Sequence, residues 1–205
     1  DDRSTMKVGT DAVLLGAAVE IHGAARILEI GTGCGVIALM LAQRSDALVD
    51  AIEIDGDSAA QARENAGLSP WKDRINIIHG SFPEYAGSCK KSYDLIVSNP
   101  PYFVDSLKPE NQKRAISRHD EKMNFRELLT GVLNLLNDRA SFWVILPLKE
   151  SREFLNIANK SGLSVHYSKM IVPKQGKPAH RVILGFRNGD AGSVISTTLV
   201  IRNAD

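Results

Sequence analysis

Apolar and polar residues alternate along the chain in two different periods. Short apolar runs at 26–30 and 93–98 are typical of buried strands, whereas 36–44 and 124–137 carry apolar residues at helical spacing. The same patterns predict further helices at 12–21, 57–66 (capped by Asp57) and 150–161. They predict further strands at 48–54, 75–79, 141–146, 163–172 and 181–186, with a weak strand at 197–202.

The order of these elements predicts an α/β fold. Strands that alternate with helices of about ten residues form a parallel sheet with helices on both faces. The segment 173–180 is too short for a helix, so the strands on either side of it should be antiparallel. We therefore expect a Rossmann-like, doubly wound, seven-stranded and mostly parallel sheet with a C-terminal antiparallel hairpin. This layout resembles class I methyltransferases, and plain dinucleotide dehydrogenases lack the hairpin.

One domain should span residues 1–205, because no linker or repeat divides the chain. The chain opens without a Met, so we expect it to be trimmed or incompletely ordered at the N-terminus. The sequence contains no signal peptide and no apolar run of about 20 residues, so we expect neither export nor a membrane-spanning helix. Cys34 and Cys89 are too few for a disulfide framework, which favours the cytoplasm.

A glycine-rich turn follows the first predicted strand. Gly31, Gly33 and Gly35 are spaced G-x-G-x-G, and Glu29 stands two residues before them. A nicotinamide loop would read G-x-G-x-x-G and direct a phosphate at the helix N-terminus. S-adenosylmethionine has no phosphate, and Glu29 could hold charge near its ammonium group, directly or through water. The spacing favours this cofactor, and an ordinary glycine turn is the alternative.

The next two strands end in residues suited to the rest of such a cofactor. Glu53, followed by Ile54, lies 20 residues beyond Gly33, where a carboxylate can accept both ribose hydroxyls. The alternative is that Glu53 caps the next helix. Ser81 and Phe82 follow the third strand and could meet the adenine as a polar contact and an apolar wall, or form an ordinary turn.

The most specific motif is Asn99-Pro100-Pro101-Tyr102-Phe103, directly after the fourth strand. Consecutive prolines fix an extended backbone. The Asn99 side-chain oxygen and the Pro100 carbonyl are then two acceptors for a planar amino group, and Tyr102 can stack on a flat substrate. We predict methyl transfer to such a group by positioning and electrostatics. A proline-stiffened loop with a buried Tyr is the structural alternative.

Other chemistries lack their signatures. The chain contains no G-x-S-x-G, no G-K-[ST] after the glycines, and no C-x-x-C or histidine spacing suited to a metal. We therefore expect neither a serine hydrolase nor a P-loop enzyme, and no metal.

Several blocks resemble the bacterial tRNA1(Val) adenine-37 N6-methyltransferases: residues 6–17, 37–44, 69–71, 99–103, 178–182 and 199–202. The resemblance spans nearly the whole chain. It implies that the stretch with Lys7, Thr10 and Asp11 lies over the methionine end of S-adenosylmethionine. Cys34 and Ala18 depart from the family, which usually has Thr or Ser, and often Trp, at these places. The family also usually extends further at both ends, so the resemblance implies trimming at the C-terminus as well.

Charge divides the chain into an acidic front and a basic back. Residues 1–100 carry 9 Lys/Arg and 14 Asp/Glu, a net charge of −5, while residues 101–205 carry 16 and 10, a net charge of +6. The predicted topology brings two basic loops to the carboxyl edge of the sheet, beside Tyr102. They hold Lys113, Arg114, Arg118 and His119, and Lys174, Lys177, His180 and Arg181. Such loops suit RNA phosphates, although solvated surface charge is the alternative for each residue.

The site residues predict a methyltransferase that uses S-adenosylmethionine and acts on a planar amino group. The family resemblance implies that this group is N6 of an adenine in tRNA, with adenine 37 of tRNA1(Val) as the expected target. The expected partner is a tRNA anticodon loop, with Pro101 and Phe103 beside the base, and a monomer is favoured. Three rival hypotheses remain: the same chemistry on guanine N2 of rRNA, on adenine N6 of DNA or on a release-factor glutamine; a non-catalytic module that binds S-adenosylmethionine and RNA; and an NAD-linked oxidoreductase, which the glycine spacing disfavours.

Overall fold

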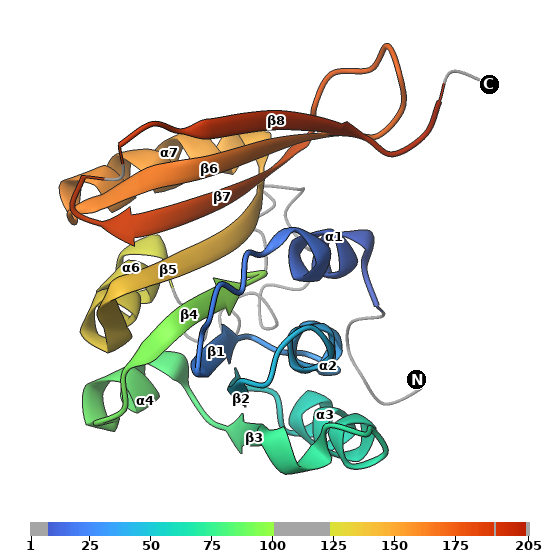
Figure 1. Cartoon of the computed structure of the whole chain (residues 1–205), viewed down its shortest axis with the longest axis vertical. Helices are drawn as coiled ribbons and strands as arrows, with labels where there is room; N and C mark the ends of the chain where they lie inside the picture. The colour runs from blue at the N-terminus through green and yellow to red at the C-terminus, as the bar shows by residue number, and fades with distance from the viewer. Residues whose placement is uncertain (1–7, 101–123, 191, 204–205) are drawn as a thin grey trace, which may run out of the picture.

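The fold is described from a computed structural model, over residues 8–100, 124–190 and 192–203. A single eight-stranded sheet has the order β3-β2-β1-β4-β5-β7-β6-β8 (Figure 1). The strands are β1 (Arg26–Ile30), β2 (Leu48–Glu53), β3 (Ile75–His79), β4 (Tyr93–Ser98), β5 (Leu136–Pro147), β6 (Leu163–Val172), β7 (Arg181–Asn188) and β8 (Ile195–Val200). β1 to β5 are parallel, and β7 is antiparallel to both β5 and β6. The predicted fold class and hairpin are confirmed.

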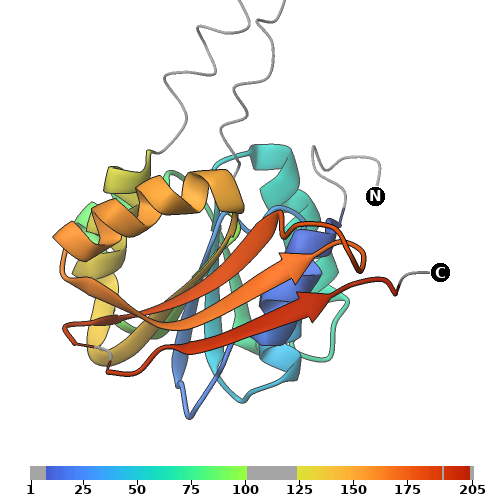
Figure 2. The same cartoon turned by 90° about the horizontal axis from the view of Figure 1, so that it is seen from above.

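Helices cover both faces of the sheet (Figure 2). One face carries α1 (Thr10–Ala18), α2 (Val36–Gln43) and α3 (Gly56–Gly67), and the other carries α4 (Phe82–Ser88), α6 (Phe125–Leu135) and α7 (Leu148–Lys160). A short 3-10 helix, η1 (Lys72–Arg74), precedes β3. Two apolar clusters result, one on each side of the sheet. Trp143 belongs to the first cluster and Phe142 to the second, as alternation along β5 requires.

The predicted strand count of seven was too low. β8 pairs in parallel with β6 and forms the edge of the sheet, with every residue exposed. Its sequence, ISTTLV, lacks the alternation of a half-buried strand, because neither of its faces is covered. The weak strand predicted at 197–202 therefore lies two residues too far along the chain.

Helix ends also needed correction. Asp55, not Asp57, caps α3, because its side chain accepts a hydrogen bond from the backbone N–H of Ser58 at 2.8 Å. α4 was missed, although Pro83 in its first turn is a helix-start signal. α6 ends at Leu135 rather than 137, because Leu136 already pairs with Tyr93 as part of β5.

Candidate functional site

The strand order reverses between β1 and β4, and this switch point locates the candidate site. The chain leaves β1 for β2 and β3 on one side, and returns to place β4 and β5 on the other. Ile30 pairs with Ser98, whose hydroxyl donates to the Ile30 carbonyl at 3.0 Å. The segments that follow, the glycine loop and Asn99, therefore leave the sheet side by side. Ligands of open α/β sheets bind in the crevice at such a point.

The glycine loop has a backbone that other residues would adopt only under strain. Gly31, Gly33 and Gly35 have φ angles of 74°, 56° and 87°. Among the described residues, no atom lies within 4 Å of where a Cβ would stand on Gly31 or Gly33, whereas Gly35 faces the Ala62 Cβ of α3 at 3.4 Å. The first two glycines thus border open space, and the third allows α2 and α3 to pack closely.

Glu29 lies beneath this loop with only 1% of its surface exposed. The Thr32 hydroxyl donates to its Oε2 at 2.6 Å. The buried Oε1 accepts no well-formed hydrogen bond within the described residues. Burial raises the pKa of Glu29 to about 8, against an ordinary value of 4.5. A cation bound nearby would compensate this buried acid.

Glu53 at the end of β2 is fixed by two backbone groups. Its Oε2 accepts from the Gly33 N–H at 2.8 Å and its Oε1 from the Asp55 N–H at 2.9 Å. Each carboxylate oxygen has a second lone pair for a further donor. The capping alternative for Glu53 does not apply, since Asp55 is the cap. Beside it, the apolar side chain of Ile54 is 54% exposed.

The end of β3 offers less than the sequence suggested. Ser81 is the N-cap residue of α4 but makes no side-chain cap bond. Phe82 is only 5% exposed, and a Cβ on Gly131 of α6 would lie 2.5 Å from its Cε1. Its ring therefore fills the core between α4 and α6, which leaves little surface for an adenine.

Asn99 and Pro100 follow β4 directly; Asn99 is half-buried and Pro100 buried. Other predicted site residues lie outside the described part of the chain: Lys7, Pro101, Tyr102, Phe103, Lys113, Arg114, Arg118 and His119.

The second basic loop lies at the carboxyl edge of the sheet, as predicted, because β6 runs parallel to β4 and β5. The Lys177 N–H donates to the Lys174 carbonyl at 3.0 Å and closes a turn. Lys177 and His180 are exposed, and Lys174 is half-buried. Arg181 differs from them, because it forms an ion pair with Asp11 of α1 at 2.9 Å, next to the exposed Thr10. Arg181, predicted to contact tRNA, and Asp11, predicted to lie at the cofactor, therefore bind each other.

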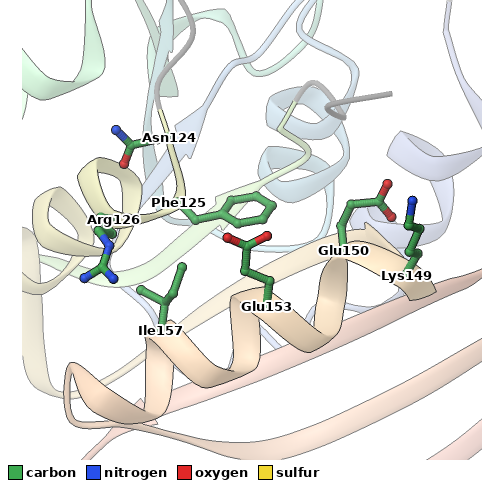
Figure 3. Close-up of a pocket in the computed structure, with 7 residues that line it drawn as sticks. All are labelled: Asn124, Phe125, Arg126, Lys149, Glu150, Glu153 and Ile157. Atoms are coloured by element: carbon green, nitrogen blue, oxygen red, sulfur yellow. The ribbon is translucent and has the colours of Figure 1, made fainter. Parts of the chain in front are cut away.

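The sequence reasoning missed a cavity of about 570 Å³ between the first turns of α6 and α7 (Figure 3). It is lined by Asn124, Phe125, Arg126, Lys149, Glu150, Glu153 and Ile157. Both helices begin at the carboxyl edge, so the cavity opens on the same side as Asn99. On α7, the Glu153 side chain lies beside the Phe125 ring, and Glu150, three residues earlier, lies nearer Lys149. The three-residue spacing of Glu150 and Glu153, which places both on one side of a helix, was the sequence feature that could have indicated them.

The described residues contain no helix long and apolar enough to cross a membrane. They also contain no group of three or more His, Cys, Asp or Glu placed to hold a metal ion.

Comparison with known proteins gave consistent matches. The sequence model of the methyltransferase small domain family matches residues 4–123. The tRNA1(Val) (adenine(37)-N6)-methyltransferase of Bacteroides fragilis is 46% identical over 186 residues, which cover 90% of this chain and 78% of that protein. The protein with the same name from Proteus mirabilis is 41% identical over 209 residues, covering 100% and 83%.

Solved structures resemble the fold at much lower identity. A predicted O-methyltransferase from Agrobacterium tumefaciens superposes with a TM-score of 0.73 at 17% identity, covering 95% of this chain and 89% of that one. The glycopeptide N-methyltransferase MtfA, complexed with S-adenosyl-L-methionine, gives 0.62 at 13% identity, covering 91% of both chains.

Proposed function

Because the chain belongs to the methyltransferase small domain family and, within it, to the tRNA1(Val) (adenine(37)-N6)-methyltransferases, we propose that Asn99 and Pro100 hold the amino group that it methylates. The protein is an enzyme that uses S-adenosylmethionine to methylate N6 of an adenine in tRNA. Its site residues and the way it engages the tRNA are the subject of the proposal.

The residues at the switch point fit S-adenosylmethionine on two observations. Open space borders Gly31 and Gly33, so a ligand can approach the backbone closely. The buried Oε1 of Glu29 accepts no well-formed hydrogen bond within the described residues, where the Ala38 backbone N–H is the group near the carboxyl, and an ammonium group would supply a further donor, directly or through water. Glu53, oriented by the Gly33 and Asp55 N–H groups, would accept the ribose hydroxyls with its remaining lone pairs. Ile54 would contact the adenine of the cofactor.

Asn99 and Pro100 carry the catalytic part of the proposal. When bound, S-adenosylmethionine supplies an electrophilic methyl group on a sulfonium. The Asn99 side-chain oxygen and the Pro100 carbonyl accept the two N–H groups of the adenine amino group and aim the nitrogen lone pair at that methyl. The new N–C bond would form as the methyl–sulfur bond breaks, with the electron pair of that bond left on a neutral thioether sulfur. The nitrogen becomes acidic only at this stage, and it then loses one of its two protons to solvent, past the Asn99 and Pro100 oxygens. Catalysis is therefore mainly positioning and electrostatics.

The proposal extends to the encounter with tRNA. The turn at 174–177 would contact phosphates of the anticodon loop, whose bases are unpaired and can enter a pocket at low cost. Tyr102 would stack on the adenine. The two cysteines are free, as a reducing compartment such as the cytoplasm would keep them. We further expect the enzyme to act as a monomer.

The position of Asn99 at the switch point carries this proposal, and its removal tests it. Asn99→Ala should lower the transfer of tritiated methyl from S-adenosylmethionine to tRNA by about 100-fold or more, as loss of one positioned catalytic hydrogen-bonding group does. The affinity for S-adenosylmethionine, measured by calorimetry, should stay unchanged. Asn134→Ala, at an exposed position on α6, is the control. Near-normal transfer by the Asn99 variant would refute the mechanism.

A further inference from the structure

Two family-specific sequence blocks, 6–17 and 178–182, lie far apart in the chain and meet in the structure. The Arg181 Nε donates to the Asp11 Oδ2 at 2.9 Å across 170 residues of sequence. The two side chains are 25% and 21% exposed, so the pair is better shielded from solvent than an ordinary surface ion pair.

Arg181 is held firmly at its end of the pair. It is the first residue of β7, and its backbone lies between Pro147 of β5 and Ile171 of β6. Its Nη1 also donates to the His180 carbonyl at 3.2 Å, and that carbonyl accepts from the Leu148 N–H at 3.1 Å. The end of the basic loop, the start of α7 and the Arg181 guanidinium are thus fixed together.

Asp11 is connected to the glycine loop through helix packing. It lies in the first turn of α1, at the carboxyl edge and on the same face of the sheet as Glu29. α1 packs so closely on α2 that a Cβ on Gly16 would lie 2.8 Å from the Met40 sulfur. Arg44, after α2, donates to the carbonyls of Gly16 and Val19 in and after α1. α1 and α2 thus pack as one unit through the last turn of α1, and α2 begins directly after Gly35 of the glycine loop.

We propose that Arg181 is a positioning residue that couples the tRNA-facing loop 173–180 to the cofactor site through Asp11. This rests on the proposed function, in which that loop contacts tRNA and the glycine loop holds S-adenosylmethionine. A loop displaced by tRNA would transmit its position through the ion pair to α1, and a bound cofactor would hold the loop in place. Such coupling is reciprocal, so each ligand tightens the binding of the other by the same factor.

A double-mutant cycle separates this coupling from a direct contact of Arg181 with RNA. The variants are Asp11→Asn, Arg181→Gln and the double variant, with Lys160→Gln at the far, amino edge as the charge control. Calorimetry with S-adenosylmethionine alone, without tRNA, should show about three- to tenfold weaker binding in each single variant, and no further loss in the double variant. The KM for tRNA should rise equally in both single variants, while kcat changes less.

Two further measurements keep the test decisive. Thermal unfolding identifies any variant that does not fold. If Arg181→Gln is such a variant, Arg181→Lys replaces it in the test; because lysine keeps the charge, this variant should retain part of the cofactor affinity. In the wild type, tRNA should tighten S-adenosylmethionine binding, and Arg181→Gln should abolish this gain.

An increase in KM for tRNA in Arg181→Gln with no change in Asp11→Asn would overturn the coupling and make Arg181 a direct RNA contact. Additive losses in cofactor affinity would overturn it as well. Absence of methyl transfer to tRNA by the wild type would count against the proposed function, whereas the cofactor-only cycle would still test the ion pair.

Discussion

The acidic cofactor half and the basic tRNA-facing half place their charges in different ways. In the first half, Glu29 and Glu53 are almost buried, and hydrogen bonds from Thr32, Gly33 and Asp55 fix their oxygens. In the second half, Lys177 and His180 extend from an exposed loop. The difference fits the proposed ligands: a small cofactor of fixed shape requires fixed partners, whereas a flexible polyanion can be held by exposed basic side chains.

Arg181 is the exception that connects the two halves. Composition places it with the basic residues of the loop, but the structure places its side chain on Asp11 of the cofactor half. Net charge by halves therefore does not assign an individual residue to one of the two proposed ligands.

Of the changes that test this difference between the two halves, loss of the Glu53 carboxylate should have the largest effect, a weaker affinity for S-adenosylmethionine. Glu53→Ala removes the acceptor of the Gly33 and Asp55 N–H groups together with the proposed ribose contact. We expect about 10- to 100-fold weaker S-adenosylmethionine binding by calorimetry, as for the loss of one or two hydrogen bonds to a charged group. The affinity for tRNA should not change. Glu84→Ala, which removes an exposed carboxylate on α4, is the control. Unchanged cofactor affinity in the Glu53 variant would exclude the proposed contact between Glu53 and the ribose.

Neutralising the basic loop should have an intermediate effect, confined to the other half. The double variant Lys174→Gln and Lys177→Gln should weaken tRNA binding about tenfold. It should also reduce the slope of log affinity against log salt by about 1 to 2, because the loss of each phosphate contact lowers the number of counterions released on binding. Gel-shift titration at several salt concentrations measures both quantities. The charge-matched pair Lys72→Gln and Lys160→Gln lies at the opposite edge. Equal effects from the two pairs would mean that the loop is not the tRNA surface.

Glu29 should give the smallest effect, measured on the stability of the chain without cofactor. Its pKa is about 8 when folded and near 4.5 when unfolded, so between these pH values the folded chain holds a proton that the unfolded chain has lost. The free energy of unfolding therefore falls as pH rises across this interval. Glu29→Gln cannot ionise, and its Tm without cofactor should exceed that of the wild type by about 2–4 °C near pH 8. The exposed Glu84→Gln is the control. Parallel pH profiles for wild type and Glu29→Gln would argue against a buried, protonated Glu29.

Much of the fold could be predicted because apolar periodicity reports burial. The bounds of β1, β3, β4 and β6 were predicted to the residue. β4 and β6 are uninterrupted buried or half-buried runs, β1 is buried after Arg26, and β3 keeps its apolar residues at 75, 77 and 78 buried or half-buried. β8 and α4 were harder, because an edge strand exposed on both faces and a helix of seven residues leave little periodic signal.

The candidate site was predictable where a motif fixes the backbone, and less so where packing decides. The glycines and Asn99 lie side by side because parallel topology brings the ends of β1 and β4 together. The burial of Phe82 against Gly131, the ion pair of Arg181 and the cavity at Glu150 depend on contacts between distant segments. No local pattern in the sequence specifies such contacts.

The identity of the methylated nucleotide tests the central claim most directly. The chain would be incubated with S-adenosylmethionine and tRNA1(Val), and the tRNA cut into fragments and analysed as nucleosides by mass spectrometry. We predict one new N6-methyladenosine, located at position 37 of the anticodon loop. A methyl group on guanine N2, on an adenine elsewhere in the tRNA, or on no nucleotide at all would contradict the claim.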